Sequence, residues 1–336
     1  MSEFQIPNSP FQITRSYLVA AALLVIAATG ALYQSISVRR EAARFPPPGR
    51  LVDVGGRRLH LLCIGQGEPT VIFEPSGLGG AVSAERARTE IAATTRVCSY
   101  DRMGMGWSDP GPAVISIGMF ADDLERLTDR AGLRPPYVLV PASMGGLVAE
   151  LFTRRHPAQV AGLVFADAAD SATLERIAHR ATWTLTQASC LPKIAARFGL
   201  LRLVDPLGLR RQAPDDAERV IARIYRVEPM ATFCGMVRGL PDTLQELRAA
   251  PPFPSGVPLT VLTAESTRGL LPPGYESAGR ELARDWRELQ HQLSRRSSRG
   301  TWRIVSGSDH LMGNSQPHAV ASAVLEMLQQ IHGARP

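Results

Sequence analysis

Lysine is almost absent from this chain of 336 residues. Lys193 is the only one, so arginine supplies nearly all of the positive charge. The net charge of +6 would suit a nucleic-acid partner, but no basic cluster with interleaved aromatic residues is present. The composition therefore argues against nucleic-acid binding, and we attribute the arginine bias to genome composition.

Cysteine is scarce as well, and the four residues are Cys63, Cys98, Cys190 and Cys234. Their spacing matches no metal site, and the glycines of 77–80 lack the dinucleotide or Walker pattern. We therefore expect no metal and no cofactor. Two local disulfides, Cys63 with Cys98 and Cys190 with Cys234, would suit an oxidising compartment. For Cys63 and Cys98, however, buried free thiols are the expected state.

One uncharged apolar run is long enough to cross a membrane. It extends from Tyr17 to Tyr33, at the low end of the required length of about 17–25 residues, with a tyrosine at each edge. We expect a single transmembrane helix over 17–33 that anchors the protein in a lipid bilayer, after a tail over 1–16. A cleaved signal peptide is the main alternative. A buried core helix fits less well, because the folded domain begins only near Arg50.

The charges beside this run leave the side of the membrane open. Arg15 precedes the run and Arg39, Arg40 and Arg44 follow it, so the positive-inside rule places the folded domain in the cytoplasm. Disulfide-bonded cysteines would favour the opposite side. Residues 34–50 are expected as a linker, and its run of prolines favours an extended spacer.

Short apolar strands alternate with helical stretches through the rest of the chain. An opening hairpin is predicted over Leu51–Val54 and Arg58–Cys63. Further strands are predicted over Thr70–Phe73, Val97–Tyr100, Tyr137–Val140, Leu163–Ala166, Leu259–Leu262 and Trp302–Val305. This alternation predicts an α/β fold with a mostly parallel twisted sheet and helices on both faces.

The longest gap between strands runs from Ser171 to Val257. Its pattern predicts helices over Thr173–Thr186, Pro192–Arg202, Asp215–Val227 and Leu240–Ala249. We therefore expect a helical cap over 171–256, inserted after the sixth strand, and a core built from 51–170 and 257–336.

Residues 136–146 carry the most specific local signal, Pro-Tyr-Val-Leu-Val-Pro-Ala-Ser-Met-Gly-Gly. A strand that runs into Ser143 and is followed by glycines has the form of a nucleophile elbow, in which a sharp turn exposes the serine hydroxyl. Gly145 and Gly146 suit the close approach of strand and helix at that turn. Pro141 departs from the pattern, because glycine is usual at that position.

Three further segments accompany the elbow in a characteristic order. Phe73–Gly80 carries Ser-Gly where a His-Gly pair is usual, Tyr100–Asp109 has the form Y-D-x-x-G-x-G-x-S, and Gly307–His310 follows an apolar strand. Together with the elbow, these segments resemble the landmarks of the α/β-hydrolase family over residues 50–335.

The resemblance implies a role for four residues. Ser143 would be the nucleophile and His310 the base that activates it. The backbone N–H groups of Met144 and Leu78 would form the oxyanion hole. The other histidines that we considered, His60, His156 and His318, are expected to be structural.

The acidic member of the triad is the open question. The family most often takes it from the loop after the seventh strand, but the corresponding residue here is Thr267 and Glu265 lies two residues early. The other known placement is the end of the sixth strand, where Asp167 stands with Asp170 nearby. We favour Asp167 and keep Glu265 and Asp170 as alternatives.

These residues predict a membrane-anchored serine hydrolase, most compatible with a carboxylic-ester hydrolase that forms an acyl-enzyme. The substrate is expected to be a small, neutral, fairly apolar ester, because the cap is rich in apolar side chains: Leu200, Leu201, Leu203, Leu207, Met230, Phe233, Met236 and Leu240, with Trp107 and Trp183 as further candidates. A thioesterase, an amidase or a carbon–carbon bond hydrolase remains open. A binding or scaffold protein that keeps the fold without catalysis is the alternative from another class.

Overall fold

A computed structural model describes residues 10–178, 188–212, 216–266 and 276–333. Within these ranges eight strands form one sheet, in the order β1-β2-β4-β3-β5-β6-β7-β8. The strands are β1 (Arg50–Asp53), β2 (Arg58–Ile64), β3 (Val71–Glu74), β4 (Val97–Tyr100), β5 (Tyr137–Pro141), β6 (Val160–Ala166), β7 (Leu259–Ala264) and β8 (Gly300–Val305). β2 is antiparallel to β1 and β4, and the other neighbours are parallel. The predicted mostly parallel sheet is confirmed.

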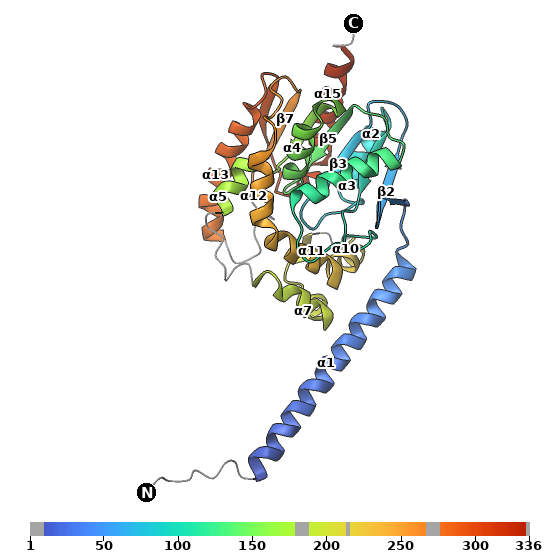
Figure 1. Cartoon of the computed structure of the whole chain (residues 1–336), viewed down its shortest axis with the longest axis vertical. Helices are drawn as coiled ribbons and strands as arrows, with labels where there is room; N and C mark the ends of the chain where they lie inside the picture. Colours follow the sequence, from blue (N-terminus) through green and yellow to red (C-terminus); the bar gives the residue numbers. More distant parts are fainter. Residues whose placement is uncertain (1–9, 179–187, 213–215, 267–275, 334–336) are drawn as a thin grey trace.

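Helices cover both faces of this sheet (Figure 1), as predicted. One face carries α3 (Ile117–Arg130), α4 (Gly145–Arg155) and α13 (Glu276–Ser294), and the other carries α2 (Glu85–Ala92) and α15 (Pro317–Gly333). Two short helical segments complete this part: η1 (Pro157–Gln159) and α14 (Met312–Ser315). Side chains alternate along β5, so Leu139 enters the first core while Val138 and Val140 enter the second.

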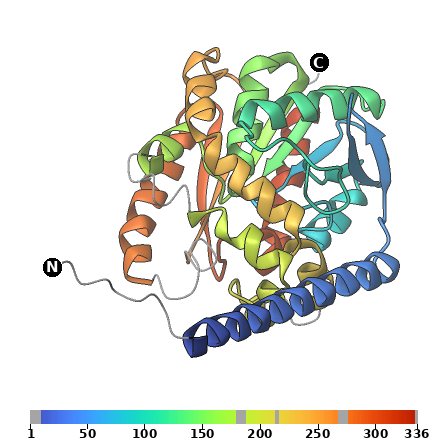
Figure 2. The same cartoon turned by 60° about the horizontal axis from the view of Figure 1, so that its bottom comes forward.

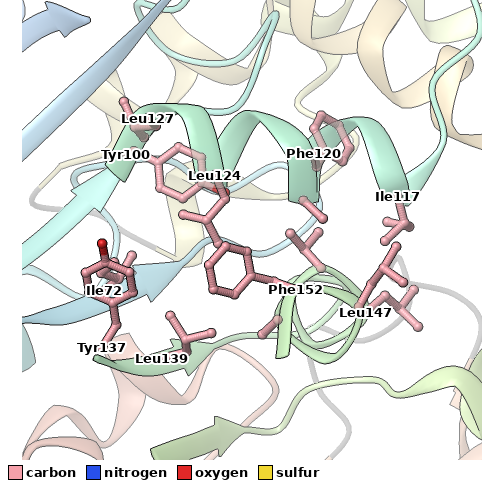
Figure 3. Packing of buried hydrophobic residues seen from close by; sticks show 14 of the residues in the cluster. Ile72, Tyr100, Ile117, Phe120, Leu124, Leu127, Tyr137, Leu139, Leu147 and Phe152 are labelled. Atoms are coloured by element: carbon pink, nitrogen blue, oxygen red, sulfur yellow. The ribbon is translucent and has the colours of Figure 1, made fainter. Parts of the chain in front are cut away.

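The larger core lies between the sheet and the helices α3 and α4 (Figure 3). Leu139 of β5, Phe152 of α4 and Leu124 of α3 lie together there, and each is inaccessible to solvent. Burying one such side chain stabilises the fold by about 1.5–3 kcal/mol. The strand and the helix on either side of Ser143 are therefore both anchored in the same core.

The insertion after β6 is helical, as predicted. Its described helices are α5 (Ser171–Ala178), α7 (Leu191–Arg197), α8 (Leu200–Val204), α9 (Leu209–Gln212), α10 (Ala217–Ile224), α11 (Val227–Arg238) and α12 (Leu240–Ala249). The single helix expected over 192–202 is wrong, because Gly199 takes a left-handed conformation (φ 71°) between α7 and α8. Helix α11 was not predicted at all. Part of the insertion packs around a small core of its own, made of Ala196, Leu201, Leu209, Ile221, Tyr225 and Met230.

The N-terminal apolar run lies in α1 (Pro10–Arg44), a helix of 35 residues that contacts the insertion and whose N-terminal part extends away from the domain (Figure 1). From Tyr17 onwards α1 is long and apolar enough to cross a membrane, and little of that part is buried in the protein. Most of the segment 34–50, expected as a linker, is helical instead. It continues α1, Gln34 and Glu41 contact the insertion, and the proline-rich end from Phe45 is not helical.

Both candidate cysteine pairs are disulfides in the structure, so the expectation of free thiols at Cys63 and Cys98 is wrong. These residues stand directly opposite each other on the antiparallel strands β2 and β4, with their Cα atoms 4.1 Å apart. Cys190 and Cys234 link the start of α7 to α11, with their Cα atoms 4.8 Å apart. The register of β2 against β4, which sequence spacing does not reveal, produces the first pair.

We expect the purified protein to contain no reactive thiol, because its four cysteines form these two bridges. Alkylation of the denatured, unreduced chain should add no mass, whereas alkylation after reduction should modify all four residues. The first bridge joins residues 35 positions apart. Replacing Cys63 and Cys98 together by alanine should therefore lower the free energy of unfolding by roughly 4 kcal/mol. Alkylation of the unreduced chain would contradict the pairing.

Candidate active site

Ser143 lies at a sharp turn between β5 and α4. Its φ of 50° is in the left-handed region, which is strained for a residue with a side chain. A Cβ atom added to Gly145 would lie 2.6 Å from the carbonyl oxygen of Pro75, and one added to Gly146 would lie 2.0 Å from that of Ala169. Both glycines are thus required by close backbone approach, and the turn has the geometry predicted for a nucleophile elbow.

His310 brings the serine and a carboxylate together. Its loop follows β8, and its Nε2 atom lies 2.8 Å from Oγ of Ser143. Its Nδ1 atom lies 2.7 Å from Oδ2 of Asp167. The imidazole is 6% exposed. Three residues that are far apart in the sequence therefore form one continuous chain of hydrogen bonds.

Asp167 stands where β6 ends, and both of its carboxylate oxygens are engaged. Oδ2 faces His310, while Oδ1 accepts hydrogen bonds from the backbone N–H of Ala264 at 2.9 Å and from Nε1–H of Trp286 at 2.8 Å. The residue is 1% exposed and has a left-handed φ of 50°. These contacts fix which oxygen meets the imidazole.

Trp286 is a site residue that sequence reasoning missed. It belongs to α13, and its ring also lies edge-on to His310, with ring centroids 5.7 Å apart. No motif marks it, because its neighbours in the sequence form an ordinary amphipathic helix. Only the packing of α13 beside β7 brings its N–H to Asp167.

The other candidate acids make different contacts. Glu265 accepts a hydrogen bond from the backbone N–H of Gly307 at 2.8 Å. Asp170 accepts from the backbone N–H of Thr173 at 2.9 Å and pairs with Arg296 at 3.3 Å. Burial raises the pKa of the Asp170 carboxyl, although these partners oppose the shift. Neither carboxylate contacts His310, and position 267 lies outside the described residues.

The two predicted oxyanion donors lie on adjacent segments. Met144 precedes α4, Leu78 is in the loop after β3, and both side chains pack against the larger core. In the described part of the chain, neither backbone N–H has a hydrogen-bond acceptor. Two such donors beside a serine are what a tetrahedral oxyanion requires.

A buried ion pair supports the loop that carries Leu78. Arg102 donates to Oε1 of Glu74 at 2.8 Å and to the carbonyl oxygen of Ser76 at 3.1 Å. The hydroxyl of Tyr100 hydrogen-bonds the other oxygen of Glu74. Burial raises the pKa of the Glu74 carboxyl, although Arg102 and Tyr100 act in the opposite direction. Buried hydrogen-bonding groups thus fix the conformation of this loop.

Asp101 links the same loop to the segment after β4. Its carboxylate accepts from the backbone N–H of Ala81 at 2.7 Å and faces Nδ1 of His60 at 2.8 Å. A Cβ atom on either Gly80 or Gly106 would lie 2.2 Å from this carboxylate. The glycines and the aspartate of the two motifs therefore form one structural unit, and His60 serves in it as a buried partner.

The remaining predicted residues lie elsewhere. His156, which directly follows α4, pairs with Glu125, and His318 of α15 pairs with Glu90. Trp107 donates its Nε1–H to the carbonyl oxygen of Phe45 at 3.1 Å. Trp183 lies outside the described residues. Among those described, no group of three or more His, Cys, Asp or Glu side chains is placed to hold a metal ion.

Residues 69–192 match the model of the alpha/beta hydrolase fold family. The sheet order and the elbow agree with that match. This chain is an α/β-hydrolase-fold protein. Solved structures with this fold align with it over most of its length, at sequence identities that support the fold alone.

Three of these structures illustrate the range of activities. An esterase from Thermogutta terrifontis superposes with a TM-score of 0.63 and 22% identity, covering 84% of this chain and 98% of the esterase. An enol-lactonase from Burkholderia xenovorans gives a TM-score of 0.59 and 16% identity, covering 83% of this chain and all of the lactonase (100%). A variant of a potato epoxide hydrolase is similar as well, with a TM-score of 0.64 and 16% identity over 84% of this chain and 98% of that one.

Two of the relatives by sequence come from yeasts. A protein from Schizosaccharomyces pombe, described as uncharacterised, is 29% identical over 235 residues, which are 66% of this chain and 38% of that protein. A vacuolar membrane protein of Saccharomyces cerevisiae is 36% identical over 93 residues, 26% of this chain and 14% of its own. The chain thus spans well under half the length of these relatives.

Proposed function

We propose that this protein is a membrane-anchored serine hydrolase that cleaves carboxylic esters through an acyl-enzyme. The observation that carries the proposal is the hydrogen-bonded chain from Ser143 through His310 to Asp167. A serine hydroxyl is a poor nucleophile until a neighbouring base removes its proton. A buried carboxylate on the far nitrogen keeps the imidazole in the tautomer that accepts that proton.

The reaction proceeds in two halves. Oγ of Ser143 attacks the ester carbonyl carbon while its proton passes to Nε2 of His310. The N–H groups of Met144 and Leu78 stabilise the negative oxygen of the tetrahedral intermediate. The carbon–oxygen bond to the alcohol then breaks, and His310 returns the proton to the leaving alkoxide. Water then attacks the carbonyl carbon of the acyl-enzyme while His310 takes its proton. The bond to Oγ breaks, His310 returns the proton to Oγ, and the carboxylic acid is released.

The serine at the elbow favours this chemistry over that of other enzymes with the same fold. Epoxide hydrolases of the family use an aspartate as nucleophile, and Ser143 cannot replace it. The esterase and lactonase among the similar structures act on carboxylic esters, which agrees with the proposal. Thioesters, amides and carbon–carbon bonds next to a carbonyl are attacked by the same machinery and remain alternatives.

The cap favours a neutral, apolar substrate, although fewer of its residues are available than the sequence suggested. Leu201, Met230 and Met236 are buried in packing. Leu78 touches both the larger core and the small core of the cap, so the cap lies over the loop that would supply an oxyanion donor. An ester bound beneath the cap would therefore be in contact with apolar side chains.

Labelling by a fluorophosphonate probe is the test of the proposal. The probe reacts covalently only with an activated serine, so the full-length protein should be labelled at Ser143 and should lose ester hydrolysis in proportion. Absence of labelling, together with absence of hydrolysis over a panel of p-nitrophenyl esters, would instead support a non-catalytic binding protein.

The anchor is the part of the proposal that concerns α1. The packing of Gly30 and Tyr33 against the cap supports a retained helix over a cleaved signal peptide. Both disulfides favour an oxidising, non-cytoplasmic side, in opposition to the arginines after the run. The protein should stay in the membrane fraction after a carbonate wash, with an intact N-terminus, and protease protection in sealed vesicles should report the side.

Trp286→Phe should lower kcat by roughly 10- to 100-fold and leave KM unchanged. The substitution keeps a ring beside His310 but removes the N–H donor to Asp167, and a hydrogen bond to a charged group contributes about 1.5–3 kcal/mol. Trp302→Phe is the matched control, since Trp302 donates a similar bond to Thr263 of β7 and not to Asp167. Equal kinetics for the two variants would remove Trp286 from the proposed machinery.

A further inference from the structure

Helix α1 packs against the cap at a defined position in its sequence, around Gly30 and Tyr33. A Cβ atom on Gly30 would lie 2.6 Å from the carbonyl oxygen of Phe198, and one on Gly199 would lie 2.7 Å from the ring of Tyr33. Two glycines thus allow α1 and the turn between α7 and α8 to meet at backbone distance. The contact involves Gly30 and Tyr33, which belong to the C-terminal end of the apolar run.

A buried polar cluster continues this contact beyond the apolar run. Arg202 of α8 donates to Oε1 of Gln34 at 2.7 Å and to Oε2 of Glu41 at 2.8 Å. Gln34 in turn donates to the carbonyl oxygen of Tyr225 at 3.0 Å. Arg202 and Gln34 are 3% and 5% exposed. Breaking such a cluster would leave buried polar groups unpaired, so α1 and the cap are held as one body.

Apolar side chains stand exposed on the cap next to this contact. On α7 they are Leu191 and Ile194, and on α8 they are Leu200, Leu203 and Val204, with exposed fractions from 48% to 71%. We call these five residues the α7–α8 patch. Figure 2 shows α7 beside α1, on the side of the molecule from which the N-terminal part of α1 extends. Clustered exposure of this kind marks a surface that contacts a partner.

Positive charge accompanies the patch. Residues 191–212 carry Lys193, Arg197, Arg202, Arg210 and Arg211 and one acidic residue, Asp205. Asp205 accepts a hydrogen bond from the hydroxyl of Tyr225, and Arg202 is used by α1. Apolar side chains with basic residues around them are typical of segments that lie in a membrane interface and attract anionic lipid headgroups.

The position of this contact relative to the membrane interface indicates which partner fits the patch. Tyr33 ends the apolar run, where an aromatic side chain occupies the interface. Gly30 is about 4.5 Å deeper along the helix, at a rise of about 1.5 Å per residue. The turn at Phe198 that touches Gly30 is therefore held at the boundary between headgroups and acyl chains, and α7 ends and α8 begins at this turn.

We propose that the α7–α8 patch inserts into the interface of the leaflet next to Tyr33, so that the cap itself contacts the lipid bilayer. The inference rests on the proposed anchor and adds a second membrane contact outside 17–33. Leu203 and Val204, the most exposed residues of the patch, enter the boundary layer, and the exposed Lys193, Arg197 and Arg211 bind headgroup phosphates. The active-site domain is then oriented with its cap toward the lipid.

Depth-dependent quenching tests the proposal in the full-length protein. All four native cysteines are in disulfides, so one introduced cysteine takes one fluorophore. The probe is NBD, attached in turn to Leu203→Cys and Val204→Cys, with the protein in liposomes of phosphatidylcholine and phosphatidylglycerol. Lipids with a nitroxide near the headgroup, or deep in the acyl chain, act as quenchers. Leu24→Cys reports the span, and Gln330→Cys on α15, at the opposite end of the molecule (Figure 1), is the exposed control.

The proposal expects shallow quenchers to reduce the fluorescence at both patch positions, deep quenchers to act at Leu24, and neither to act at Gln330. Quenching at Leu24 without quenching at Leu203 and Val204 overturns the proposal while the anchor stands. A blue-shifted but unquenched signal at the patch also overturns it, because a protein then covers the patch. No quenching at Leu24 means that the anchor fails and the proposal with it, whereas labelling of Ser143 is unaffected by that result.

Discussion

Ser143→Ala should abolish labelling by a fluorophosphonate and reduce ester turnover by roughly 10⁶-fold, as for removal of the nucleophile from a serine protease. The substitution removes Oγ, the only atom that would bond to the substrate carbonyl, and leaves the N–H of Met144 in place. The left-handed turn and the glycines behind it do not involve the hydroxyl, so the fold should persist. Labelling intensity and kcat on a p-nitrophenyl ester are the measurements.

Ser298→Ala is a matched control, because Ser298 is an exposed serine whose hydroxyl bonds the carbonyl oxygen of Ser255. It should label like the unmodified protein. His310→Ala should be as damaging as Ser143→Ala, and the double variant no worse, because members of a triad act as a unit. If Ser143→Ala were labelled as strongly as the unmodified protein, the nucleophile would be another residue.

Asp167→Asn should lower turnover by roughly 10⁴-fold, by analogy with the same change in a serine protease. The backbone N–H of Ala264 and the indole N–H of Trp286 both point at Oδ1. In the variant they hold the amide oxygen, and the NH₂ group faces His310. Nδ1 must then accept a hydrogen bond, the ring proton moves to Nε2, and Nε2 can no longer take the proton of Ser143.

Glu265→Gln and Asp170→Asn are the controls for this prediction, because both are carboxylates near strand ends whose contacts are with other groups. Each should retain most of the kcat, even where Asp170→Asn lowers stability through its lost pairing with Arg296. If Glu265→Gln proved the crippling change and Asp167→Asn stayed active, the acid would belong to the loop after β7.

The part of the site that could be predicted from the sequence is the part in which the local backbone conformation restricts the residue type. The elbow needs a strand, a left-handed serine and two residues without side chains, and all of these are written within residues 137–146. The same holds for Gly80 and Gly106, which must leave room for the Asp101 carboxylate. Such constraints act over a few residues, and a sequence displays them directly.

The acid could not be chosen in this way. Asp167 and His310 are 143 residues apart, and three carboxylates stand near strand ends on the same edge of the sheet. The choice among them depends on which side chain the loops after β6 and β8 bring to Nδ1. It also depends on Trp286, which reaches Asp167 only because α13 packs beside β7.

The same division applies to the rest of the chain. The alternation of strands and helices determined an α/β sheet with a helical insertion, and the uncharged run determined a helix near the N-terminus, because hydrophobic period and length are local properties. Only the tertiary structure decided that this helix continues to Arg44, that Cys63 meets Cys98, and that the cap presents Leu203 and Val204 beside α1. Each of these depends on register and packing between segments distant in the chain, where one residue of shift changes the partner.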